Sequence, residues 1–263
     1  MPRRRRRALP VAAVVVSLGL AGLGFGSWQL AAAGRVEPPG PGARQAVLNS
    51  PGRSPAAPAG SATSGAERAP RPISYPVRGP GRWLFATGNG AVAGRSGDLL
   101  RYRVAVEEGI AGLTANEFAG RAEATLADPR SWTAGGQWRL RRVGPDGPYD
   151  FTIYLATPAT RDELCAMGYD RYTSCRNGDR VVVNVARWAH GVPHYGASLD
   201  TYRQYVVNHE VGHRLGHGHE LCPGQGRPAP VMQQQTLGLH GCTAFAWPWR
   251  DGNRYAGPSG AYD

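Results

Sequence analysis

Four of the chain's seven histidines and one glutamate stand within the twelve residues NHEVGHRLGHGH, at 208–219. His209 and His213 are four residues apart, so on an α-helix both rings project from one face, one turn apart. This spacing suits two imidazole nitrogens that bind the same Zn²⁺. Glu210 can act as a general base on a zinc-bound water. The stretch therefore predicts a zinc site that activates water, and the alternative is a polar helix face with exposed histidines.

A third ligand has to come from beyond the helix, because a third side chain on the same face would crowd the first two. Gly216 can adopt a left-handed backbone conformation without steric cost and end the helix there. His219 can then return to the metal from the following loop. His217 is the competing ligand if the helix continues, but its neighbours Gly216 and Gly218 each cost about 1 kcal/mol in a helix. The pattern favours His219.

The extended motif H-E-x-x-H-x-x-G-x-x-H resembles that of the metzincin zinc peptidases. Metzincins have a methionine-containing turn beneath the metal, and APVMQQQ places Met232 thirteen residues after His219. The resemblance implies a zincin-like α+β fold with a mixed sheet, an active-site helix that carries H-E-x-x-H, a Met-turn, and one Zn²⁺ per chain. The alternative for Met232 is an ordinary core methionine.

A longer resemblance covers roughly 78–250. It rests on the runs RYRVAVEEG, LADPRSW, VNVARW, YRQYVVNHEVGHRLGHGHELCPGQG and PAPVMQQQT. These runs resemble an uncharacterised domain family of exported actinobacterial proteins that is usually grouped with zinc peptidases. The resemblance implies a zincin-like fold but no defined substrate.

Other ligand sets fit the sequence less well. In thermolysin-like enzymes the third ligand is a glutamate from a later helix, but residues 221–250 contain no Asp or Glu. His190, His194 and His240 lie outside the motif, and we expect them to be surface or hydrogen-bonded histidines. The His219 assignment therefore stands by elimination as well as by pattern.

Hydrophobic periodicity predicts the elements that must position the site. Strands are expected at 99–109, 137–143, 150–156 and 180–188. Helices are expected at 114–128, with Thr114 as its N-cap, at 157–167, and at 199–216, where the histidine motif lies. This order predicts an α+β fold with one sheet and two substantial helices.

Composition divides the chain into four parts. Residues 1–34 join five arginines to a long uncharged apolar run, which predicts a signal anchor or a cleaved signal peptide. Residues 35–75 are rich in Pro, Gly, Ala and Ser and are predicted to be a disordered linker. Residues 76–250 are the expected zincin-like catalytic domain, and 251–263 a loose C-terminal tail. Everything after residue 34 is expected outside the cytoplasm, either held at the cell membrane by a single span or secreted.

The four cysteines agree with an exported domain, because an even number in that setting indicates disulfides. They contain no C-x-x-C pair of the kind that structural zinc sites use. Three connectivities are open. We favour the two local pairs, Cys165–Cys175 and Cys222–Cys242, because each closes a short loop.

Charge argues against a nucleic-acid partner. The net charge is +11, but residues 1–71 hold ten arginines against two glutamates, whereas 72–263 hold twenty arginines against seventeen acidic residues. The expected domain is therefore only mildly basic and lacks the basic stripe that nucleic-acid binders show.

The sequence predicts a zinc metalloendopeptidase that hydrolyses a peptide bond through a zinc-bound water, with Glu210 as general base. We expect a peptide or protein substrate, including one from the cell envelope, to bind along the sheet edge formed by the strand from Arg180. No tyrosine follows Met232 until Tyr255, so a second oxyanion donor is not identified. The alternatives are a zinc amidase of cell-wall peptides and a non-catalytic zinc-containing envelope binding module.

Overall fold

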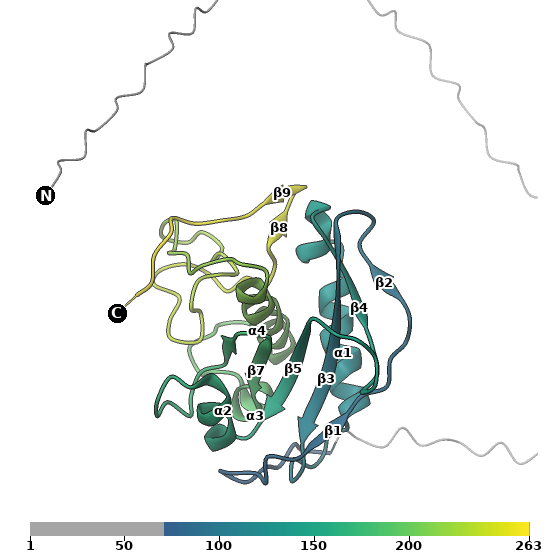
Figure 1. Cartoon of the computed structure of the whole chain (residues 1–263). Helices are drawn as coiled ribbons and strands as arrows, with labels where there is room; N and C mark the ends of the chain where they lie inside the picture. The colour runs from purple at the N-terminus through teal and green to yellow at the C-terminus, as the bar shows by residue number, and fades with distance from the viewer. Residues whose placement is uncertain (1–70, 263) are drawn as a thin grey trace, which may run out of the picture. The chain divides into compact units, whose positions relative to one another are not determined.

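Strand β3 (Asp98–Glu107) is the longest strand of a seven-stranded mixed sheet (Figure 1). The computed structural model describes residues 71–262. The remaining strands of this sheet are β1 (Trp83–Phe85), β2 (Val92–Ala93), β4 (Trp138–Arg142), β5 (Phe151–Ala156), β6 (Cys175–Asn177) and β7 (Arg180–Asn184). Their order is β2-β4-β3-β5-β7-β6, and β1 pairs with β3. A small second sheet pairs β8 (Trp249–Arg250) with β9 (Asn253–Arg254).

The helices are α1 (Ala115–Ala127), α2 (Pro158–Cys165), α3 (Val185–His190) and α4 (Leu199–Arg214), with a 3-10 turn at Trp132–Gly135. Strands β3, β4, β5 and β7 are parallel, whereas β1, β2 and β6 are antiparallel to their neighbours. The crossover through α1 leads from β3 to β4, and the crossover through α2 leads from β5 toward β7. The two therefore run from the centre of the sheet toward opposite edges. Because such crossovers are right-handed, they lie on opposite faces of the sheet.

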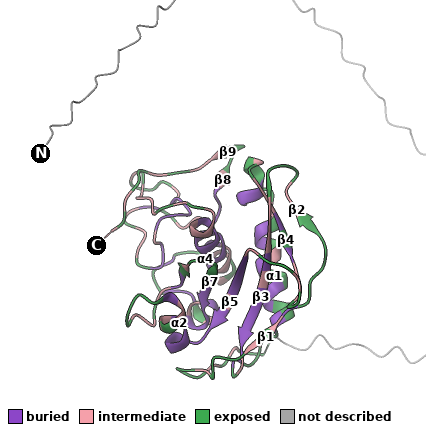
Figure 2. Ribbon diagram, in the orientation of Figure 1, coloured by how far each residue is buried: buried purple, intermediate pink, exposed green. Residues whose placement is uncertain are grey.

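The main core lies between the sheet and the face covered by α1 and α4. Alternate residues of β3 and β5 point into it, with Val104, Ile153 and Leu155 fully buried. Burying one such side chain stabilises the fold by roughly 1.5–3 kcal/mol. Figure 2 shows the buried residues concentrated on the central strands and on the helices that pack against them. This core fixes α4, and with it the histidine motif, against the sheet.

The α+β class predicted from periodicity and the mixed sheet implied by the resemblance are present. Helix α1 begins at the predicted cap, where the Thr114 hydroxyl accepts from the Glu117 backbone and the Glu117 carboxylate accepts from the Thr114 backbone. The predicted strand at 180–188 is shorter than expected. It ends at Asn184, whose side chain caps α3 by accepting from the Ala186 N–H at 3.0 Å.

The position of the sheet edge differs from the prediction. Strand β7, expected to be the exposed edge, is covered by β6, which pairs with it antiparallel through Cys175, Arg176 and Asn177. A three-residue strand is too short to show periodicity in sequence. The edge beside the histidine motif is therefore β6.

Both boundaries of the folded part also differ from the prediction. Ser74, placed in the linker by composition, exchanges two backbone hydrogen bonds with Ala111, at 3.0 and 2.8 Å. The prediction of a loose tail from residue 251 is wrong, because Leu221 N–H donates to the Pro258 carbonyl at 2.7 Å and Gly260 N–H donates to that of His219 at 3.1 Å. The predictions for 1–34 and 35–70 lie outside the described residues. Within 71–262, no helix combines the length and the apolar character that a membrane span requires.

Candidate metal centre

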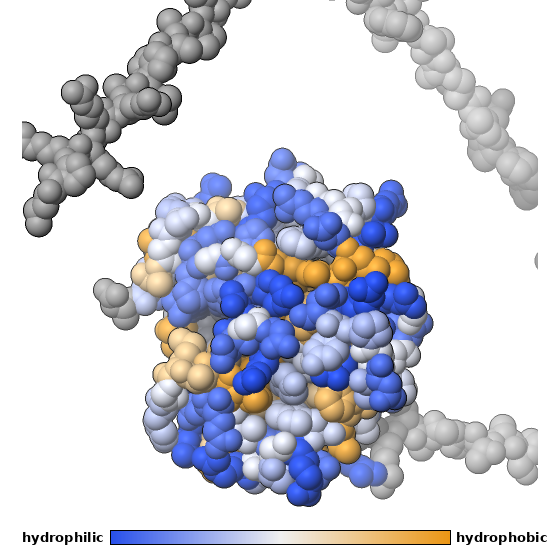
Figure 3. Space-filling model, in the orientation of Figure 1, coloured by the Kyte–Doolittle hydropathy of each residue, from blue (hydrophilic) through white to orange (hydrophobic). Residues whose placement is uncertain are grey.

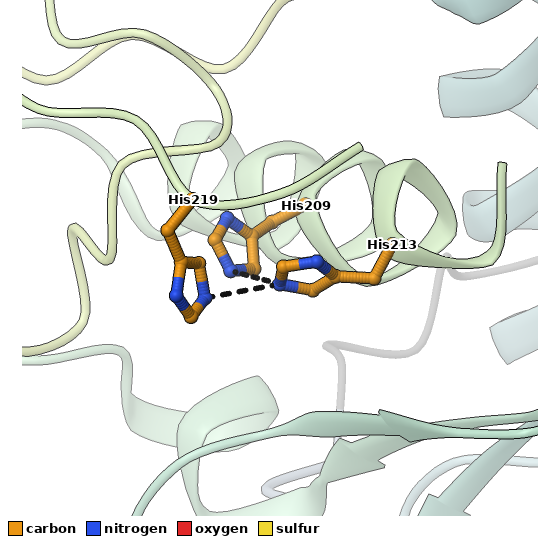
Figure 4. Close-up of side chains that lie close together, drawn as sticks. All are labelled: His209, His213 and His219. Atoms are coloured by element: carbon orange, nitrogen blue, oxygen red, sulfur yellow. Dashed lines mark hydrogen bonds between the residues drawn. The ribbon is translucent and has the colours of Figure 1, made fainter. Parts of the chain in front are cut away.

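Three histidine rings converge at the C-terminal end of α4 (Figure 4). Nε2 of His213 lies 3.2 Å from Nε2 of His209 and 3.1 Å from Nε2 of His219. One ligand atom from each ring lies within 4.8 Å of the others. Within residues 71–262, these three histidines are the group of side chains placed to hold a metal ion. The three histidines predicted from spacing are thus brought together.

The opposite ring nitrogens of the two helical histidines are hydrogen-bonded to backbone carbonyls. Nδ1 of His209 lies 2.8 Å from the Val231 carbonyl oxygen, and Nδ1 of His213 lies 2.8 Å from the His217 carbonyl oxygen. Because a carbonyl only accepts, each Nδ1 carries the proton and each Nε2 keeps a free lone pair. This is the tautomer that binds a metal through Nε2.

Helix α4 ends in a Schellman arrangement that returns the chain to the site. Gly216 has φ +96°, the left-handed conformation predicted for it. Its N–H donates to the His213 carbonyl at 3.2 Å, and that of His217 donates to the Gly212 carbonyl at 3.0 Å. The chain then leaves the helix axis, which lets His219 approach the two helical histidines from the loop.

His217 does not join the cluster. Its ring stacks on that of Trp132, with centroids 4.4 Å apart and planes 20° apart. The contribution of His217 to the site is its backbone carbonyl, which accepts a hydrogen bond from Nδ1 of His213. The remaining histidines also lie apart from the cluster: His194 contacts the Gln235 carbonyl, and His240 stacks on Tyr262.

Met232 lies in a turn directly under α4. The turn is closed by a 3.0 Å hydrogen bond from Gln233 N–H to the Pro230 carbonyl, and the Met232 side chain is fully buried. A Cβ placed on Gly212, in the middle of H-E-V-G-H, would lie 2.4 Å from the Met232 sulfur. The turn thus touches the helix between the two histidines, and its Val231 carbonyl orients His209.

Glu210 is a buried carboxylate beside the cluster. Its side chain is 4 % exposed, and its Oε2 has no hydrogen-bond partner within the described part of the chain. Burial raises the pKa of Glu210 to about 8, while the charges of Arg161 and Arg176 act in the opposite direction. A carboxyl group whose pKa lies near neutrality is suited to taking up and giving back a proton.

The histidines are held in their neutral form. Burial lowers the pKa of His209 well below its usual value and lowers that of His213 to about 4. Burial also lowers the pKa of His219. Neutral imidazole is the form that binds metal.

The cluster opens into a cavity of about 430 Å³. Besides the three histidines and Glu210, the side chains along its walls include Arg161, Met167, Thr173, Arg176, Tyr205, Gln234 and Leu237. These residues come from α2, the 166–174 loop, edge strand β6, α4 and the 234–237 turn. Sequence reasoning missed them, and nothing in their local pattern marks them, because only the fold brings these segments together.

Both predicted disulfides are present, Cys165–Cys175 and Cys222–Cys242. The first closes the loop that forms one wall of the cavity. That loop is organised around Arg161, which pairs with Asp162 at 3.0 Å and with Asp170 at 2.7 Å. The second disulfide ties the segment after His219 to the segment before β8.

One comparison with known proteins identifies the family. The family model described as a protein of unknown function, DUF3152, matches residues 70–250. This span covers the sheet, the helices and the histidine cluster. No curated protein and no solved structure matches the chain. The chain therefore belongs to the DUF3152 family.

Proposed function

We propose that this protein is a zinc-dependent metalloendopeptidase with a zincin-like, metzincin-related catalytic domain. The observation that carries the proposal is the convergence of three histidine Nε2 atoms beside the buried carboxylate of Glu210, which has an unpartnered oxygen. A structural zinc site needs no such carboxylate. The arrangement therefore favours catalysis over a binding module.

The donor set fits zinc. With Zn–N distances of about 2.0–2.1 Å, two nitrogens of a tetrahedral site lie about 3.3 Å apart. The 3.2 and 3.1 Å separations around Nε2 of His213 agree with this value. His209, His213 and His219 would hold the ion, and three protein ligands leave one position open, as in catalytic zinc sites.

Zinc bound there would supply a Lewis acid that acidifies water and polarises a carbonyl group. Glu210 accepts a proton from the attacking water and then gives it to the amide nitrogen. When the C–N bond breaks, the nitrogen side of the substrate therefore leaves as a neutral amine. The burial of Glu210 raises its proton affinity. The hydrogen bonds that Nδ1 of His209 and Nδ1 of His213 donate to the Val231 and His217 carbonyls keep the two helical rings in place throughout.

The substrate that suits this cavity is an extended peptide. Edge strand β6 lines the cavity, and an exposed edge can pair with a peptide backbone. The guanidinium of Arg176, on β6, lines the cavity and donates to the His213 carbonyl at 3.0 Å. We propose Arg176 as the second donor to the developing oxyanion.

The two disulfides support a site of action outside the cytoplasm, where envelope peptides and proteins are the available substrates.

Replacing the carboxylate tests the proposal. The full-length chain loaded with zinc should cleave an unstructured protein or cell-wall peptides, and Glu210→Gln should keep its zinc but lose at least about 100-fold in rate. Elemental analysis gives the zinc content, and mass spectrometry gives the products. Glu163→Gln, which alters an exposed glutamate outside the cavity, is the matched control. A wild-type chain without zinc, or a Glu210→Gln variant that cleaves at the wild-type rate, would rule the proposal out.

A further inference from the structure

The segment 251–262, here called the C-terminal strap, runs along the loop that carries His219. Gly260 N–H donates to the His219 carbonyl at 3.1 Å, and Leu221 N–H donates to the Pro258 carbonyl at 2.7 Å. Between them, Glu220 and Ser259 form an isolated antiparallel bridge. The strap therefore pairs with the backbone on both sides of Glu220, the residue that follows His219.

Side chains strengthen this contact. Nη2 of Arg254 lies 2.8 Å from Oε1 of Glu220, and the two side chains are 23 % and 12 % exposed. The same guanidinium lies over the Trp132 ring, 5.0 Å from its centroid. Trp132 in turn donates to the Asn208 carbonyl on α4 at 2.8 Å. Arg254 thus links the loop that holds His219 to the helix that holds the other two histidines.

The far end of the strap is anchored as well. The Cys222 N–H donates to the Tyr262 hydroxyl at 2.9 Å, and the Tyr262 ring stacks on His240. A side chain at Gly257 would lie 2.1 Å from the Leu221 carbonyl oxygen. The strap and the loop therefore approach each other at backbone distance, and the fit is specific to this pair of segments.

The loop requires such support for a physical reason. His209 and His213 are fixed by the hydrogen bonds of α4, but His219 lies beyond the helix end, after Gly216 and Gly218. Glycine has more backbone freedom than other residues, so an unsupported loop would lose more entropy when it places its ring on the metal. The strap removes that freedom in advance.

We propose that the C-terminal strap positions the third metal ligand, with Arg254 as its main positioning residue. The inference rests on the proposed zinc site. It goes beyond the family match, which ends at residue 250, before the strap begins. Arg254 is not among the side chains that line the cavity, so its effect should appear in metal affinity and should pass through His219.

The test is the zinc dissociation constant of the full-length chain, measured by competition with a chelator. Arg254→Ala and a chain that ends at Arg250 should each bind zinc about 10–100-fold more weakly, the usual loss when an outer partner of a metal ligand is removed. Arg82→Ala, which breaks an Arg–Glu pair outside the cavity, should stay within about twofold of wild type on the scale expected for exposed pairs. If Arg254→Ala fails to fold, Glu220→Gln takes its place.

A double-mutant cycle separates positioning from general destabilisation. In a His219→Ala background, Arg254→Ala should cause no further loss of zinc affinity, because the ligand that it positions is already gone. An equal loss in both backgrounds, or an unchanged affinity in the single variant, would overturn the inference and leave the peptidase proposal intact. A wild-type chain that binds no zinc would overturn both. A chain that binds zinc as expected but hydrolyses nothing would leave the strap inference standing.

Discussion

One pair of histidines, close together in the sequence, shows how closely the chain is fitted around the candidate metal centre. His217 and His219 are two positions apart, yet one ring stacks on Trp132 and the other faces the cluster. In a regular extended chain, residues two positions apart point to the same side, so the backbone between the two histidines, which passes through Gly218 and is not part of a strand, departs from that regular form. The two histidines form a matched pair for mutation.

His219→Ala should reduce bound zinc well below one per chain, whereas His217→Ala should leave it near one. The first variant removes a ligand nitrogen, and the second keeps the backbone carbonyl that accepts from His213. Elemental analysis after dialysis against zinc-buffered solution measures both. Equal zinc contents in the two variants would mean that His219 is not a ligand.

Gly212 offers a test of packing at a single residue. A Cβ there would lie 2.4 Å from the Met232 sulfur and 2.6 Å from a Trp132 ring carbon. Gly212→Ala should lower the free energy of unfolding by about 1–3 kcal/mol, as overpacking does, although alanine is the better helix former. Urea unfolding at fixed free zinc measures this. The control is Gly120→Ala on α1, where nothing lies within 4 Å and a gain of about 0.5–1 kcal/mol is expected. If Gly212→Ala and Gly120→Ala both raise the free energy of unfolding, the Met232 and Trp132 side chains move aside at little energetic cost.

At the scale of elements, one buried carboxylate joins the sheet to α2. Glu107, at the end of β3, is fully buried. It accepts from the backbone N–H groups of Gly81 and Thr157, at 3.0 and 2.8 Å, and from the Thr160 hydroxyl at 2.7 Å. Because α2 ends in Cys165 and leads into the loop beside the cavity, this junction supports one wall of the site.

Glu107→Ala should lower the free energy of unfolding by at least about 2 kcal/mol, because it leaves buried donors without an acceptor. Glu108→Ala is the matched control. It removes the neighbouring carboxylate, whose partner Arg82 is exposed, and should cost less than about 1 kcal/mol. Chemical denaturation followed by tryptophan fluorescence compares the two. Similar losses would indicate that the buried hydrogen bonds add little.

At the scale of the whole molecule, hydrophilic and apolar side chains share the surface of the described residues. Figure 3 shows hydrophilic side chains interrupted by smaller apolar patches on the face displayed. Two exposed apolar side chains, Met167 and Leu237, belong to the cavity lining. The peptide substrate proposed above would meet these two apolar side chains in the cavity.

Zinc should stabilise the entire fold. Only the folded chain brings together the α4 histidines and the loop that carries His219, so zinc at 100 times its dissociation constant should add about 2.7 kcal/mol. For a domain of this size, each kcal/mol raises Tm by about 2–4 °C. Calorimetry with zinc and with a chelator should show this shift in the wild type and a much smaller one in His219→Ala. Identical melting curves for the wild type would mean that the folded state has no zinc site.

The sequence by itself determined the features that depend on neighbours along the chain. The period of α4 places His209 and His213 on one face, and Gly216 ends that helix, because both effects are local backbone geometry. Strand β3 and helix α1 were predictable from alternation and from the Thr114 cap. The two disulfides join cysteines that are close in sequence, so short-loop closure was enough to favour them.

Tertiary structure decided what depends on segments far apart in the chain. The Val231 carbonyl that orients His209 is 22 residues away, and the Arg254 side chain that reaches Glu220 is 34 residues away. Neither contact leaves a periodic signal, since each depends on where two loops meet. The same holds for β6, which is too short to show alternation. The polar composition of residues 251–262 suggested a loose tail, because composition does not register backbone hydrogen bonds made to a distant loop.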